Sequence, residues 1–122
     1  MAFAVRDLFG APAPDVLAED VTFHSPVTDY SGRADIAHLF AAIGRCMTDV
    51  EEGTVFTAGS RSVTEFTGRV GEHDVDGVLV QRAGDDGRLE EATLLLRPFA
   101  ALRAAVAMMG DILGADPLPS RR

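Results

Sequence analysis

Four side chains in this sequence could supply acid–base chemistry, and they fall into two groups. His24 directly precedes Ser25 at the end of an alternating segment, and Tyr30, the only tyrosine, follows a few residues later. An imidazole can act as a base near neutral pH, and a phenol can donate a hydrogen bond to a ligand carbonyl. Glu65 and Asp76 form the second group, and they would make an acid pair if both side chains faced the interior.

Each of these candidates also has a plainer interpretation. Alternation places Val21, Phe23 and Ser25 on one face of a strand, which turns His24 to the other face, where a hydrogen-bonded histidine at a strand end is the expected role. Ser25 either lines a cavity or bonds the backbone as a turn residue ahead of the following proline. Tyr30 either reaches the mouth of a cavity or caps the loop before the next helix.

Glu65 and Asp76 fit a charged outer surface near Arg69 better than an interior acid pair. The three charges fall on the same face of two neighbouring strands when the strands are paired through a tight turn. A shift of one residue in that pairing would turn both acids inward.

Composition excludes several classes of function. The chain has 122 residues and a formal net charge of −8, and an acidic surface repels phosphate backbones, so neither nucleic acid nor an anionic membrane is an expected partner. No group of His, Cys, Asp and Glu has metal-ligand spacing and no glycine-rich phosphate loop occurs, so no metal and no cofactor are predicted. The single cysteine, Cys46, is expected to be a small apolar filler.

No segment approaches the roughly twenty apolar residues that a membrane span needs. Arg6 and Asp7 come too early for the apolar core of a signal peptide. A cytoplasmic protein is therefore the expectation.

The elements that must position these residues follow from hydrophobic periodicity. In chain order we expect a short helix over residues 3–9, a helical turn over 15–19, a strand over 21–25, a helix that begins at an N-cap at Ser31 and carries an apolar stripe to Met47, strands from Val50 onward that include 55–58, 62–70, 73–83 and 89–97, and an amphipathic helix over 99–113. Helices followed by a run of hairpins predict an α+β domain over residues 1–114 with a flexible tail over 115–122.

Turn chemistry sets the pairing of the strands. A two-residue turn at Gly71-Glu72 pairs Val70 with His73 and Thr64 with Leu79. The inward face then carries a mostly apolar set: Phe66, Val70, Val75, Leu79, Ala92, Leu94 and Leu96.

The opposite face mixes charges with apolar side chains. A four-residue loop at 84–87 places Arg97 opposite Asp74, which predicts an ion pair. Glu65, Arg69, Asp76 and Glu91 share this face with Val63, Val78, Val80 and Leu95. Such a face is either solvated or a sheet-to-sheet contact in a homodimer, and the β-branched residues favour the dimer.

Three stretches, LAEDVTFHSPV, SGRADIAHLF and DDGRLEEATLLLRPF, resemble the nuclear transport factor 2-like superfamily in its SnoaL-like branch, over about residues 16–113. The resemblance implies a cystatin-like roll: a curved antiparallel sheet wrapped over helices as a cone with a central apolar pocket, often dimerising through the sheet. The superfamily includes ketosteroid isomerases, polyketide cyclases, epoxide hydrolases and catalytically silent proteins.

The same resemblance implies that the catalytic carboxylates of these enzymes are replaced. The isomerases place their general base, an aspartate, immediately before the proline, where this chain has Ser25; their second acid matches Leu79. The epoxide hydrolases need an Arg-x-Asp in the strand that here reads SVTEFTGRV, where it is absent, and an acid in the last strand, which matches Leu94.

The expected pocket is nearly all apolar. Its predicted lining is Phe23, Ser25, Tyr30, Phe40, Ile43, Phe66, Val75, Leu79, Leu94, Leu96 and Val106. Such a pocket favours binding of a small apolar molecule without an acid pair. Two alternatives stay open: an isomerase, polyketide cyclase or epoxide hydrolase-like enzyme with unorthodox acid–base residues, and a structural dimer with a closed pocket.

Overall fold

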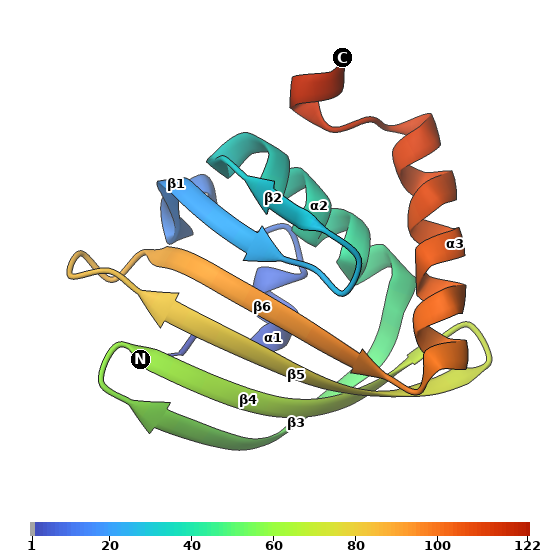
Figure 1. Cartoon of the computed structure of the whole chain (residues 1–122), viewed down its shortest axis with the longest axis horizontal. Helices are drawn as coiled ribbons and strands as arrows, with labels where there is room; N and C mark the ends of the chain where they lie inside the picture. Colours follow the sequence, from blue (N-terminus) through green and yellow to red (C-terminus); the bar gives the residue numbers. More distant parts are fainter. Residues whose placement is uncertain (1) are drawn as a thin grey trace.

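A strongly curved six-stranded sheet, seen in the computed structural model of the protein, wraps around two longer helices and one short one (Figure 1). The structure describes residues 2–122. Its elements are α1 (Val5–Leu8), a 3-10 turn (Pro14–Val16), β1 (Leu17–His24), β2 (Asp29–Ser31), α2 (Arg33–Cys46), β3 (Met47–Ala58), β4 (Arg61–Val70), β5 (His73–Ala83), β6 (Leu89–Arg97), α3 (Phe99–Ala115) and a second 3-10 turn (Pro119–Arg121). The predicted α+β class and curved sheet are confirmed.

The strands lie in the order β2-β1-β6-β5-β4-β3. All neighbours pair antiparallel except β1 and β6, which are parallel. A parallel pair needs a long crossover connection, and α2 with the three following strands supplies it. The sheet is therefore mixed rather than purely antiparallel.

The pairing of β4 with β5 is the predicted one. Val70 lies opposite His73 and Thr64 opposite Leu79, because Gly71 takes the positive φ of 59° that the tight turn requires. Between Ser62 and Gln81 the inward side chains away from the turn are consequently buried, and the outward ones are exposed or half-buried.

The pairing of β5 with β6 differs from the prediction by two residues. Arg97 lies opposite Asp76 rather than Asp74 for two reasons: Ala83 pairs with Leu89, so the loop has five residues instead of four, and the ladder shifts by one further residue between Arg82 and Ala83. The ion pairs follow this register: Arg97 contacts Asp76 at 2.9 Å. Asp74 is instead 2.9 Å from a guanidinium nitrogen of Arg69 on β4. A register shift of two residues leaves every side chain on its predicted face of the sheet.

α2 begins one residue later than expected. Ser31 ends β2, and Gly32, with a φ of 95°, occupies the N-cap position without any side-chain hydrogen bond. The apolar stripe of the helix faces the sheet as predicted, with Ile36, Leu39 and Phe40 almost fully buried.

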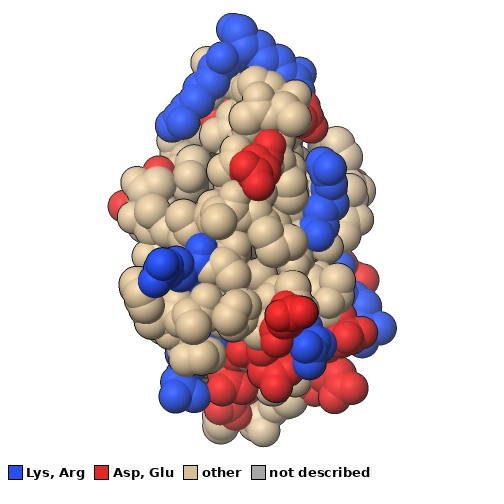
Figure 2. All heavy atoms as spheres, turned by 90° about the vertical axis from the view of Figure 1, so that its right-hand side faces the viewer, with Lys and Arg blue, Asp and Glu red and all other residues tan. Residues whose placement is uncertain are grey.

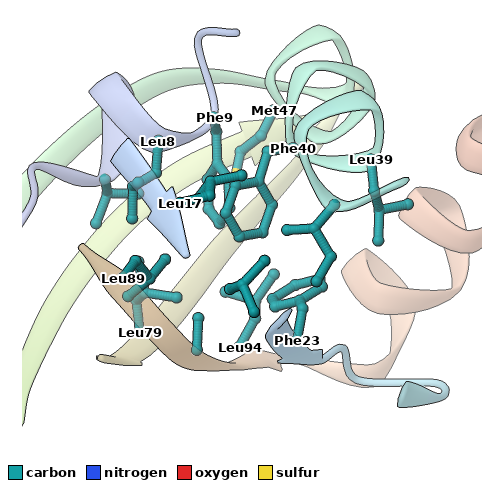
Figure 3. Close-up of a cluster of buried hydrophobic side chains, with 14 of the residues drawn as sticks. Leu8, Phe9, Leu17, Phe23, Leu39, Phe40, Met47, Leu79, Leu89 and Leu94 are labelled. Carbon is teal, nitrogen blue, oxygen red and sulfur yellow. The ribbon is translucent and has the colours of Figure 1, made fainter. Parts of the chain in front are cut away.

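An edge-to-face aromatic cluster fills the inner end of the cone. The ring of Phe40 on α2 packs against Phe9 at 5.3 Å and against Phe23 on β1 at 4.9 Å between ring centroids. Leu79, Leu89 and other aliphatic side chains from the sheet surround these rings (Figure 3). These side chains therefore belong to one buried core at the inner end.

The C-terminal residues pack against α2, although we expected residues 115–122 to be flexible. Leu118 is only 3% exposed. The backbone N–H of Ser120 donates to the carboxylate of Asp35 at 2.9 Å, and the Nε2 atom of His38 lies 2.8 Å from the backbone carbonyl of Asp116. Leu118, which lies between two prolines, therefore anchors the C-terminal residues. The polar composition of this segment gave no indication of such an anchor. None of the helices in residues 2–122 has the length and apolar character that crossing a bilayer requires.

We expect the close approach of α1 to α2 to make Gly44 irreplaceable. A Cβ atom at Gly44 would lie 1.5 Å from the carbonyl oxygen of Phe9, so Gly44→Ala must push the two segments apart. Urea unfolding should show a loss of roughly 2–4 kcal/mol.

Gly114→Ala is the matched control, because a Cβ there meets nothing within 4 Å on a helix. Its stability should be unchanged or raised by up to about 1 kcal/mol. Equal effects of the two substitutions would contradict this packing.

Candidate functional site

A cavity of about 240 Å³ lies between the sheet, α2, α3 and the loop that joins β1 to β2. Its walls are Phe23, Ser25, Pro26, Val27, Tyr30, Leu39, Ile43, Cys46, Met47, Val70, Leu94, Leu96, Leu102, Ala105, Val106, Met109, Gly110 and Leu113. Val27 and Val106, 66% and 45% exposed, mark the rim of the cavity. The surface on the α3 side is largely uncharged in its middle, and charged side chains gather towards its ends (Figure 2).

The structure divides the predicted lining residues into two sets. Phe23, Ser25, Tyr30, Ile43, Leu94, Leu96 and Val106 line the cavity. Phe40, Phe66, Val75 and Leu79 do not; they belong to the solid core, each at most 3% exposed. The reason is the aromatic cluster around Phe40, which fills the inner end and leaves open space only towards the rim.

Sequence reasoning missed several lining residues. Cys46 and Met47 lie where α2 ends and β3 begins, and Met109 faces the cavity from α3. The helical spacing of Leu102, Val106 and Met109 was visible as an apolar stripe, but periodicity does not distinguish a cavity wall from a packed core.

The hydroxyl of Ser25 is not available to a ligand. It donates to the carbonyl of Thr28 at 2.7 Å. It also accepts from the backbone N–H groups of Val27 and Thr28, at 3.2 and 3.0 Å. Ser25 therefore lines the cavity but acts as a turn residue, the plainer of its two interpretations.

Tyr30 offers the cavity a polar group. It lies on β2, opposite Phe23 in the sheet, and it is partly buried against the core. Its hydroxyl forms no hydrogen bond with another side chain or backbone group in residues 2–122, so it can donate to a ligand. Cys46 adds a thiol whose pKa is raised by burial, which keeps it neutral.

His24 lies on the outer face of the sheet, away from the cavity. Its Nδ1 atom is 2.8 Å from the carboxylate of Asp29 on β2, and its Nε2 atom is 2.9 Å from that of Glu91 on β6. Hydrogen bonds to Asp29 and then to Glu91 raise the pKa of His24, and the bond to His24 lowers the pKa of Glu91. Arg82 approaches Glu91 from β5 at 3.5 Å. His24 thus ties the edge strand β2 to the centre of the sheet.

Glu65 and Asp76 also face outwards, as the confirmed register requires. Both border a second hollow, of about 700 Å³, on the outer face of the sheet. Glu51 and Arg97 line the same hollow, and Arg97 pairs with Asp76. The structure therefore brings these two acids together, but on the side of the sheet opposite the cavity.

We expect His24 to make stability depend on pH. A raised folded-state pKa means that protonated His24 stabilises the fold; this contribution is complete below the unfolded-state pKa of about 6.5 and is lost as pH rises through the folded-state pKa. Urea unfolding of the wild type and of His24→Gln should show a stability difference that shrinks as the solution becomes alkaline.

NMR titration of the imidazole provides the direct check. Asp29→Asn and Glu91→Gln should each lower the pKa of His24 towards its ordinary value, because each removes one hydrogen-bonded carboxylate. A pKa that neither substitution changes would contradict the assignment.

Comparisons with known proteins identify relatives by structure. No protein-family model matches the sequence, and no curated protein matches it. A steroid delta-isomerase from Pseudomonas aeruginosa is 30% identical, with a TM-score of 0.82 over 90% of this chain and 82% of that one.

Two further solved structures share the fold. An uncharacterised protein with a cystatin-like fold from Silicibacter pomeroyi is 23% identical, with a TM-score of 0.86 over 93% of this chain and 82% of that one. An NTF2-like protein of unknown function from Mesorhizobium loti is 24% identical, with a TM-score of 0.67 over 76% of this chain and 84% of that one. Because it has a curved sheet wrapped around α2 and a 30% identical relative over most of both chains, this protein belongs to the nuclear transport factor 2-like superfamily.

Proposed function

We propose that the protein binds a small, neutral and largely apolar molecule in the cavity between α2, α3 and the β1–β2 loop, without using an acid pair. One observation carries the proposal: within residues 2–122, the walls of this cavity include no carboxylate, imidazole or basic side chain. A charged ligand would lose its hydration there without gaining a partner, whereas an apolar ligand gains by burial.

The position of polar groups around the cavity supports the same conclusion. Ser25 is occupied by the backbone, so the Tyr30 hydroxyl is left to orient a ligand through one hydrogen bond. Apolar walls with a few placed polar groups are the usual composition of small-molecule sites.

An isomerase-like activity is the second candidate, favoured by the 30% identical steroid delta-isomerase. Moving a proton between carbons needs a base beside the substrate and a group that stabilises the developing oxyanion. Here Ser25 and Leu79 occupy the positions that the resemblance gives to those acids, and Leu79 is fully buried. His24, Glu65 and Asp76 lie outside the cavity, so Tyr30 is the one sequence-predicted catalytic candidate on its wall. Binding is therefore the better-supported function.

We also propose that two copies associate through the outer face of the sheet. Phe56 and Leu95 are 56% and 55% exposed on this face, and the valines between them are only half-buried. The ion pairs Arg69–Asp74 and Arg97–Asp76 lie at one end of this face, and Arg82 pairs with Glu90 and Glu91 towards the other end. An apolar centre with a charged rim is the composition of a protein interface.

Binding is tested with prodan, a neutral naphthalene ketone whose fluorescence increases in apolar surroundings. We expect the wild type to bind it saturably and Val106→Arg to bind it at least about tenfold more weakly, because an arginine at the rim obstructs entry. Ala107→Arg is the matched control: the next residue of α3 is exposed and does not line the cavity. Equal loss in both variants would contradict binding at this site.

The dimer is tested by light scattering coupled to size exclusion. We expect the wild type to have twice the mass of the chain and Leu95→Lys to be a monomer, because a lysine would bring an unpaired charge into the apolar centre. Phe99→Lys, a comparable change at an exposed position on α3, should leave the dimer intact. A monomeric wild type would overturn the proposal.

A further inference from the structure

The cavity is small for a ligand-binding site. Its volume of about 240 Å³ lies below the ~300–1,000 Å³ of typical sites for drug-sized ligands. Phe40, held edge-to-face between Phe9 and Phe23, closes the inner end, and Phe66 and Leu79 are buried in the core rather than lining free space. A volume of this size suits one or two rings and is too small to enclose a four-ring steroid.

The walls carry an unusual share of polarisable atoms. Three sulfur-containing side chains, Cys46, Met47 and Met109, line the cavity from α2, β3 and α3. Two aromatic side chains, Phe23 and Tyr30, line the cavity from β1 and β2. Sulfur attracts the edges of aromatic rings, and aromatic rings attract one another edge-to-face.

These contacts discriminate between ligands of equal size. A saturated ring gains only burial from the cavity walls, and it presents slightly more apolar surface than its aromatic counterpart. An aromatic ring gains the sulfur and ring contacts as well. Cys46 does not complicate this comparison, because burial raises the pKa of its thiol and keeps it from acting as a nucleophile.

We infer that the natural ligand is a neutral aromatic molecule of one or two rings that carries one hydrogen-bond acceptor, such as an aryl ketone. The rings lie against the sulfur atoms of Cys46, Met47 and Met109, and the acceptor faces the hydroxyl of Tyr30. The inference rests on the proposed binding function and specifies its ligand class.

The test compares tetralone with decalone, two bicyclic ketones with the same carbon skeleton, of which only tetralone is aromatic. Calorimetry with the wild-type protein should show tetralone binding about threefold more tightly, whereas burial alone predicts equal or tighter binding of decalone. Tyr30→Phe should weaken both ketones by a similar factor of about two to ten, the effect of one neutral hydrogen bond.

Met109→Leu identifies the source of the preference. The substitution keeps the volume but removes a sulfur, so it should reduce the ratio of the two affinities while leaving decalone unchanged. Met108→Leu is the matched control, because its neighbour Met109 lines the cavity and Met108 does not. Androstenedione, a four-ring steroid ketone, should bind at least about tenfold more weakly than tetralone.

The outcomes separate the two proposals. Prodan binding together with equal affinities for tetralone and decalone, or an unchanged ratio in Met109→Leu, overturns the ligand class and leaves the binding function standing. Tighter binding of androstenedione overturns the size limit. Failure of prodan and of both bicyclic ketones to bind overturns the binding function and the ligand class together.

Discussion

Phe40 packed edge-to-face between Phe9 and Phe23 is the contact on which the rest of the structure depends. It joins three parts of the chain through side-chain contacts: the N-terminal segment, α2 and β1. Each ring is at most 4% exposed, so the cluster combines aromatic geometry with nearly complete burial. Because it fills the inner end of the cone, it also determines where open space can remain.

The curvature of the sheet separates two chemical environments. Side chains on the inner face pack around α2 or line the cavity, whereas the outer face carries ion pairs between carboxylates and guanidinium groups beside exposed and half-buried apolar side chains. Exposed ion pairs of this kind contribute little to stability, about 0–1 kcal/mol each. Strand alternation places His24, Glu65 and Asp76 on the outer face, and the walls of the cavity are neutral.

The cavity consequently differs in chemistry from the enzymes that the fold resembles. A catalytic carboxyl beside a substrate has its pKa adjusted by its surroundings, and apolar surroundings raise it. Here Leu79 and Leu94 are almost fully buried where the resemblance implies acids. In the proposed binding function, burial, one hydroxyl and the sulfur-containing side chains would therefore select a ligand by shape and polarity.

Alternation and turn residues in the sequence determined the fold class, the faces of β4 and β5, and the outward direction of His24. The period of two assigns each side chain to a face of the sheet, and the tight turn at Gly71 sets the register of β4 against β5. Local rules were therefore sufficient to predict this pairing. The β5–β6 register, which pairs Arg97 with Asp76, depends on how the loop over residues 84–88 closes and on the irregularity beside Ala83. Alternation carries no information about the resulting shift of two residues.

The boundary of the cavity was decided by the tertiary structure alone. Phe40 and Ile43 belong to one apolar stripe, yet Phe40 is core and Ile43 is wall, because only Phe40 has two rings to pack against. Leu118 likewise anchors a tail of polar composition through a contact distant in sequence. Sequence periodicity specifies which side chains turn inwards, whereas the fit between elements distant in the chain determines whether the space they face is filled.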